Sequence, residues 1–157
     1  MTESSGPEIR PSSLRPARED IPVPDGYGLM PLVDPFEAYV GPFFERMRDG
    51  PSGPELMVAF RVDERHLNGA GSVHGGMLMT FADAALGTAI WRLTSRVPSV
   101  TVSMQIDFLK PARLGDLVET APILTRRTRS ILFVRATFEV GGEPVLHATS
   151  LWKVLGA

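Results

Sequence analysis

Residues 75–91 read GGMLMTFADAALGTAIW, and this stretch decides the fold. Apolar or small residues fall on every face of a helix of this length, which predicts that the helix is buried. Asp83 is the only ionisable residue between His74 and Arg92. A buried carboxylate is costly unless it is paired or hydrogen-bonded. Asp83 is therefore either satisfied by nearby backbone and hydroxyl groups or present for chemistry.

Alternating apolar residues predict strands on both sides of this helix. A first strand is expected over residues 55–62. The later strands are expected at residues 100–108, 117–124, 131–140 and 145–155. One helix that is apolar all round, followed by antiparallel strands, predicts an α+β fold in which a sheet wraps around one long central helix. Because one small sheet cannot cover so much apolar surface, part of the helix is expected to face a partner subunit.

Residues 1–50 are expected to form an N-terminal extension ahead of a main domain at residues 51–157. The first 25 or so residues are rich in Pro, Ser and charge, and they lack the apolar content that offsets the entropy of ordering, which predicts disorder. Between residues 32 and 47, aromatic and apolar side chains recur at spacings near three and four. That spacing predicts a short helix or two, interrupted near Gly41-Pro42. These aromatic side chains either line a pocket or cover the core.

Composition excludes several classes of site. The chain has 157 residues, enough for one domain with a core, and its net charge of -2 argues against nucleic-acid binding. It has no cysteine, which excludes thiolate nucleophiles, disulfides and Cys-ligated metals. The three histidines match no metal-binding spacing, so neither a metal nor another cofactor is expected. The N-terminus lacks the apolar segment of a secretory signal, and residues 75–91 are slightly short for a membrane span. We therefore expect a cytoplasmic protein with no membrane partner.

The start of the predicted helix, His74-Gly75-Gly76, is a second candidate for chemistry. The first N–H groups of a helix have no intrahelical acceptor, and they bind anions or a carbonyl oxygen that becomes negative. Gly75 and Asp83 are eight residues apart, or about 12 Å along a helix axis, which is too far for both to serve one reacting carbon. Two antiparallel copies of the helix would bring Gly75 of one chain toward Asp83 of the other. If both residues are catalytic, the protein is at least a homodimer, or a dimer of dimers, with shared sites.

The motif around the helix start resembles that of a known family. Residues 66–76 read HLNGAGSVHGG, and Asp83 follows seven residues later. This Asn-x5-His-Gly-Gly-x6-Asp pattern resembles the PaaI-type acyl-CoA thioesterases of the hotdog superfamily, as do residues 100–104 and 110–116. The resemblance runs from about residue 55 to the C-terminus. It implies the hotdog fold, an acyl-CoA substrate and hydrolysis of the thioester without a cofactor.

The resemblance also implies roles for individual residues. Asp83 would be the catalytic carboxylate, either a general base for water or a nucleophile, and the Gly75 N–H would polarise the thioester carbonyl. Asn68 and His74 would orient the loop, the carbonyl or the water. The alternatives are that Asn68 forms a turn and that His74 only holds the loop through backbone hydrogen bonds. Thr101 would position the water, unless it is an ordinary strand threonine. Gly76 adds unobstructed backbone for substrate binding.

Coenzyme A carries phosphates, so basic residues should lie near the mouth of the site. Residues 110–135 carry six Lys or Arg side chains against two acids. Lys110, Arg113 and Arg127 are the candidates for phosphate binding, although each could equally lie on a solvated basic face. The alternative for the whole protein is a hotdog domain that binds an acyl-CoA or lipid without turning it over.

Overall fold

The computed structural model describes residues 20–31, 35–51, 53–96 and 98–156. The disorder predicted for the N-terminus falls mostly on residues 1–19, which lie outside the described residues. The elements, in chain order, are β1 (Gly28–Leu29), α1 (Pro35–Val40), β2 (Phe43–Gly50), β3 (Gly53–Arg61), the short 3-10 helix η2 (Glu64–His66), α2 (Gly75–Leu93), β4 (Ser99–Phe108), β5 (Leu117–Thr120), β6 (Ile123–Arg127), β7 (Ile131–Val140) and β8 (Glu143–Val154).

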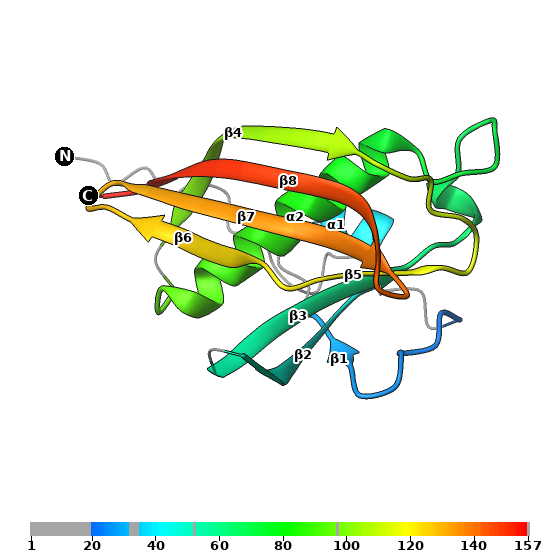
Figure 1. Cartoon of the computed structure of the whole chain (residues 1–157), viewed down its shortest axis with the longest axis horizontal. Helices are drawn as coiled ribbons and strands as arrows, with labels where there is room; N and C mark the ends of the chain where they lie inside the picture. The colour runs from blue at the N-terminus through cyan, green and yellow to red at the C-terminus, as the bar shows by residue number, and fades with distance from the viewer. Residues whose placement is uncertain (1–19, 32–34, 52, 97, 157) are drawn as a thin grey trace, which may run out of the picture.

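All strand pairs are antiparallel and belong to one eight-stranded sheet. The order across the sheet is β1-β2-β3-β5-β7-β8-β4, and β6 pairs with β7 beyond the end of β5. Helix α2 crosses one face of this sheet diagonally, with its N-terminal end toward the arrowhead of β4 (Figure 1). The predicted α+β fold, an antiparallel sheet around one long helix, is confirmed.

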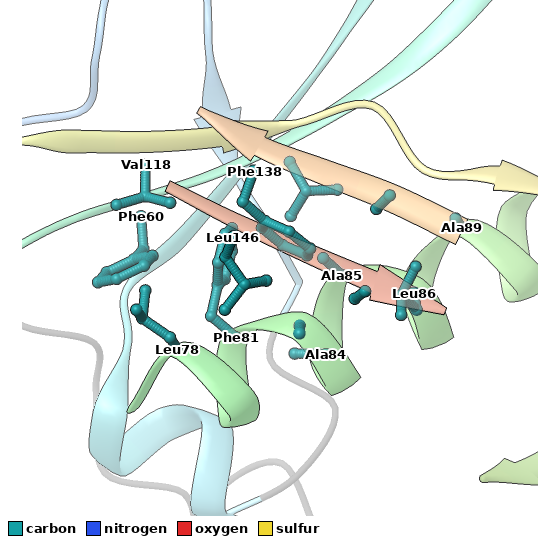
Figure 2. Close-up of a cluster of buried hydrophobic side chains, with 14 of the residues drawn as sticks. Phe60, Leu78, Phe81, Ala84, Ala85, Leu86, Ala89, Val118, Phe138 and Leu146 are labelled. Carbon is teal, nitrogen blue, oxygen red and sulfur yellow. The ribbon is translucent and has the colours of Figure 1, made fainter. Parts of the chain in front are cut away.

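The core lies between α2 and the sheet. Phe81, near the middle of the helix, is fully buried and packs against the rings of Phe43, Phe60 and Phe138. Further along α2, small alanines let the helix approach the strands β7 and β8, as Figure 2 shows for Ala85 and Ala89. The face of α2 that meets the sheet therefore packs closely against the strands.

The prediction of helix for residues 43–47 is wrong, because these residues begin strand β2. Phe43 and Phe44 are both buried, and β2 pairs with β3 from Phe43↔Phe60 to Gly50↔Gly53. Among the described residues of the segment where a short helix or two were predicted, only those of α1 are helical. Since a boundary at residue 50 would cut this hairpin, we propose that the sheet domain begins before β2 rather than at residue 51.

The strand predicted at residues 117–124 is divided into β5 and β6. The break falls at Ala121-Pro122, and proline has no N–H to donate to a sheet ladder. The other predicted strands, which are β3, β4, β7 and β8, and helix α2 were located to within about two residues, whereas the short β1 was not predicted. Gly141 and Gly142 both have positive φ, as the tight turn between β7 and β8 requires.

Candidate active site

Asp83 lies on α2 beside the edge strand β4, and it is half-buried rather than fully buried as its apolar neighbours suggested. The Thr101 hydroxyl of β4 donates a hydrogen bond of 2.7 Å to Asp83 Oδ1. No hydrogen-bond donor contacts Asp83 Oδ2 within the described part of the chain. One carboxylate oxygen is thus fixed in place, and the other is open to a bound molecule.

A β-bulge aims Thr101 at the helix. The register of β4 against β8 runs Thr101↔Trp152 and then Ser103↔Leu151, so one residue is inserted in β4. Beyond the bulge, Met104 and Ile106 pack on the core. Without the bulge, simple alternation would put Val102, and not Thr101, on the same face as these two residues. Strict alternation would place Thr101 on the face of Ser103 and Asp107, but the bulge turns it to the face of Met104 and Ile106.

The N-terminus of α2 leaves one donor free. His74 is the N-cap, and its Nδ1 accepts a hydrogen bond of 2.9 Å from the Gly76 N–H. The neutral His74 ring then carries its proton on Nε2. In contrast, the Gly75 N–H has no acceptor among the described residues. Gly75 therefore supplies the open backbone donor, whereas Gly76 contributes only its lack of a side chain.

Asn68 organises the loop that leads into α2. Its Oδ1 accepts hydrogen bonds from the backbone N–H groups of Ala70, at 2.9 Å, and Ser72, at 3.3 Å. Its Nδ2 donates to Ser72 Oγ at 3.0 Å. These are the contacts of a turn-forming asparagine, one of the two roles that the sequence left open. In this arrangement, Asn68 acts on the site by fixing the loop.

His66 is a structural residue of the site that the sequence pattern did not single out. It is 4% exposed, its Nδ1 accepts from the Asp63 N–H at 3.0 Å, and its Nε2 lies 2.8 Å from the Val40 carbonyl oxygen. Its own carbonyl accepts the His74 N–H at 2.7 Å. His66 thus ties the end of α1 to the start of α2. The only signal in the sequence was its position at the beginning of the motif.

The three basic candidates lie at two ends of the molecule. Lys110 follows β4 near the start of α2 and is ion-paired with Glu143 at 2.5 Å, an interaction that lowers the pKa of Glu143. Arg113 belongs to the same end, because a β-bridge joins its backbone to Ser72, and its guanidinium has no partner among the described residues. Arg127 ends β6, at the opposite end of the sheet, roughly 30 Å away by strand length.

Comparison with known proteins assigns the family. The thioesterase superfamily model matches residues 70–146, the range that holds Gly75, Asp83 and Thr101. A candidate esterase of Pseudomonas aeruginosa is 34% identical over 133 residues, covering 84% of this chain and 97% of that protein. The chain belongs to the thioesterase superfamily.

Two further relatives define the type of this thioesterase. Acyl-coenzyme A thioesterase 13 of Mus musculus is 35% identical over 95 residues, covering 59% of this chain and 68% of that protein. The structure of the phenylacetic acid degradation protein PaaI of Thermus thermophilus superposes with a TM-score of 0.64 at 28% identity, covering 78% of this chain and all of that one. The predicted PaaI-type hotdog thioesterase is confirmed.

Two hollows meet at Asp83 of this thioesterase. One, of about 530 Å³, follows α2 toward its C-terminal end, and the other, of about 300 Å³, lies toward α1 and contains Phe36 and Met79. Within residues 20–31, 35–51, 53–96 and 98–156, no three His, Asp or Glu side chains are grouped to hold a metal ion. No helix in those same ranges is long and apolar enough to span a membrane.

Proposed function

We propose that this thioesterase hydrolyses an acyl-CoA thioester to a carboxylic acid and free CoA, with Asp83 as the general base. The observation that carries the proposal is the carboxylate of Asp83, with Oδ1 held by Thr101 and Oδ2 open beside a hollow. A general base must lie within hydrogen-bond range of the proton that it removes. A water between Asp83 Oδ2 and the Thr101 oxygen would satisfy that requirement.

The reaction consumes one water. Asp83 Oδ2 takes a proton from the water while the water oxygen attacks the thioester carbon. The carbonyl oxygen then becomes an oxyanion. A free backbone N–H stabilises that charge. The tetrahedral intermediate then collapses, the carbon–sulfur bond breaks, and the sulfur leaves as the CoA thiol after receiving the proton. The atoms and the proton balance with water and the thioester as the two substrates.

The backbone donor comes from a second copy of the chain. Gly75 and Asp83 of one chain are about 12 Å apart along α2. The outer edge of β4 has no strand partner within the described residues, and Val100 and Val102 on this strand are 46% and 58% exposed. Unpaired strand edges are normally covered. A two-fold partner on this side would cover Asp83 and bring the Gly75 N–H of the partner chain to it.

This arrangement also ranks the three basic candidates for binding a CoA phosphate. In a two-fold pair with antiparallel helices, Lys110 and Arg113 of one copy lie beside the Asp83 half of the other. Arg113 is the first candidate for a CoA phosphate, because its guanidinium is exposed and unpaired within the described chain. Arg127 is separated from β4 by three strand spacings, about 14 Å, so its reach to the same CoA is poorer.

The shared site predicts complementation between two inactive variants. Gly75→Pro removes the donor and Asp83→Asn removes the base, so each homodimer has no complete site. A mixed dimer has one complete site, and a 1:1 mixture after subunit exchange should regain about a quarter of wild-type activity. Thiol release is measured before and after exchange under mild dissociating conditions. Activity that stays at the level of the separate variants, despite proven exchange, would contradict a shared site.

Thr101→Val tests the partner of the carboxylate. A hydrogen bond to a charged group contributes about 1.5–3 kcal/mol, so loss of the hydroxyl should lower kcat by roughly 10- to 100-fold. Thr101→Ser keeps the hydroxyl and should retain most of kcat, which makes it the matched control. Equal rates for the Val and Ser variants would show that the threonine serves only the strand.

The proposal as a whole is tested by thiol release from a panel of short, medium, long and aryl acyl-CoA esters. We expect turnover of at least one ester with a kcat that depends on Asp83. The alternative is a hotdog domain that binds an acyl-CoA or lipid without turning it over. Saturable binding of an ester without turnover, with the same affinity in Asp83→Asn, would favour that alternative.

A further inference from the structure

The larger hollow beside Asp83 follows a single stripe of α2. Asp83, Gly87 and Trp91 all line it, and residues four apart lie on one face of a helix. The stripe is about 12 Å long, at 1.5 Å per residue. A group bound along it would therefore begin at the carboxylate and extend toward the C-terminal end of α2.

The walls of this hollow are mainly apolar. Met30 and Pro31, from the segment after β1, form one side, and Trp152 of β8 contributes its indole. Met30 is itself buried, and its sulfur accepts a hydrogen bond of 3.4 Å from the Thr88 hydroxyl of α2. A hollow of about 530 Å³ with such walls has the size and character of a site for a small apolar group.

Gly87 lets the indole lie directly on the helix. A Cβ at position 87 would stand 3.0 Å from Trp152 Cη2, closer than a side chain tolerates without movement. The indole cannot easily turn away, because its Nε1 donates to Ser150 Oγ at 2.8 Å and the residue is 5% exposed. A side chain at position 87 would therefore take up space in the hollow beside the indole and narrow it there.

Charged groups line the far end of the stripe, and Glu37 of α1 lines the hollow as well. Arg92 of α2 is ion-paired with Glu45 of β2, and Arg96 and Ser99 lie beyond. An apolar chain that reached this ion pair would have to desolvate it, which is unfavourable. The apolar part of the hollow is thus limited in length.

The second hollow at Asp83, near Phe36 and Met79, is smaller, and those two side chains are exposed. An open hollow of this kind suits a path for CoA, which is large and charged.

We propose that the hollow along Asp83, Gly87 and Trp91 receives the acyl group, and that Gly87 and Trp152 determine its width. The inference rests on the proposed function, since it places the acyl carbonyl at Asp83. The acyl group is uncharged, and it ends before the Arg92–Glu45 pair, within about 12 Å of the carboxylate. We therefore expect acyl groups much longer than this stripe to bind more weakly than those that fit it.

Two variants test the proposal in opposite directions. Gly87→Ala narrows the hollow, and kcat/KM for the bulkiest accepted ester should fall by roughly 10- to 100-fold relative to acetyl-CoA, the scale of one methylene in a pocket. Met30→Ala widens it and should move the preference toward bulkier acyl groups. Gly28→Ala on β1 is the control, because a Cβ there meets only the Glu45 carbonyl oxygen, at an ordinary 3.9 Å. If both pocket variants fold, yet neither alters the ranking of the esters, the proposal is overturned.

Binding of S-alkyl-CoA thioethers separates this inference from the proposed function, because a thioether has no carbonyl to hydrolyse. Calorimetry with wild type should show affinity that rises with alkyl length and then falls once the chain exceeds the hollow. Gly87→Ala should shift that maximum to shorter chains. If no ester releases thiol but this pattern holds, hydrolysis fails and the acyl site stands. Affinity that ignores both alkyl length and Gly87→Ala would overturn the acyl site alone.

Discussion

Asp83→Asn should lower kcat for acyl-CoA hydrolysis by about two to four orders of magnitude, the usual scale for loss of a general base. The amide keeps the shape of the carboxylate and still accepts the Thr101 hydroxyl through its oxygen, but it cannot take a proton from water. The fold should survive, because Asp83 makes its one side-chain hydrogen bond to a strand already fixed by β8. Thiol release under saturating ester measures the effect.

Asp49→Asn is the matched control for this experiment. It makes the same chemical change on exposed β2, far from α2, and should leave kcat and the thermal midpoint essentially as in wild type. Circular dichroism and size-exclusion chromatography should show the same helix content and assembly for both variants. Near-wild-type turnover by a correctly assembled Asp83→Asn would remove Asp83 from the mechanism.

Gly75→Pro should lower kcat by about 10²–10³-fold, the range for loss of one oxyanion donor. Proline is favoured at the first position of a helix, where the missing N–H has no intrahelical acceptor. The preceding residue, His74, has φ -63° and ψ 134°, a conformation that a following proline accepts. The substitution therefore deletes a donor at a position where proline suits the backbone. Rates are compared by thiol release.

Gly75→Ala separates the effect of losing the backbone N–H from the effect of adding a side chain. An added Cβ lies 3.3 Å from the ring of Phe108 in either variant, so crowding is common to both. Alanine keeps the N–H, and kcat for Gly75→Ala should exceed that for Gly75→Pro by at least tenfold. If the two variants are equally slow, crowding rather than loss of the N–H explains the defect, and the oxyanion role of Gly75 is wrong.

The sequence predicted the central helix and the sheet around it because both depend on local periodicity. Residues 131–140 are rich in β-branched and aromatic residues and form β7 as predicted. Strand β2 was missed because its spacing also fits a helix. Its identity depends on pairing with β3, and on the burial of both Phe43 and Phe44. Local pattern cannot show such non-local pairing.

For the candidate site, the motif located Asp83 and Gly75, but it could not place their surroundings. Thr101 is hydrogen-bonded to Asp83 only because a bulge rotates the start of β4. No residue type in that strand predicts a bulge. Trp152 is distant in sequence and becomes a wall of the hollow through folding alone. Gly87 was the one available signal, since glycine inside a strong helix often marks close approach of another group.

The exposed edge of β4 has a consequence for handling the protein. In a free protomer, ten residues of strand, with Val100 and Val102 exposed, form a template on which any extended chain can add. The proposed two-fold pairing would therefore also protect this edge against aggregation, beyond completing a site. A variant that weakens the pairing should precipitate on concentration while its helix content is still intact, so solubility would report assembly before any spectroscopic sign of unfolding.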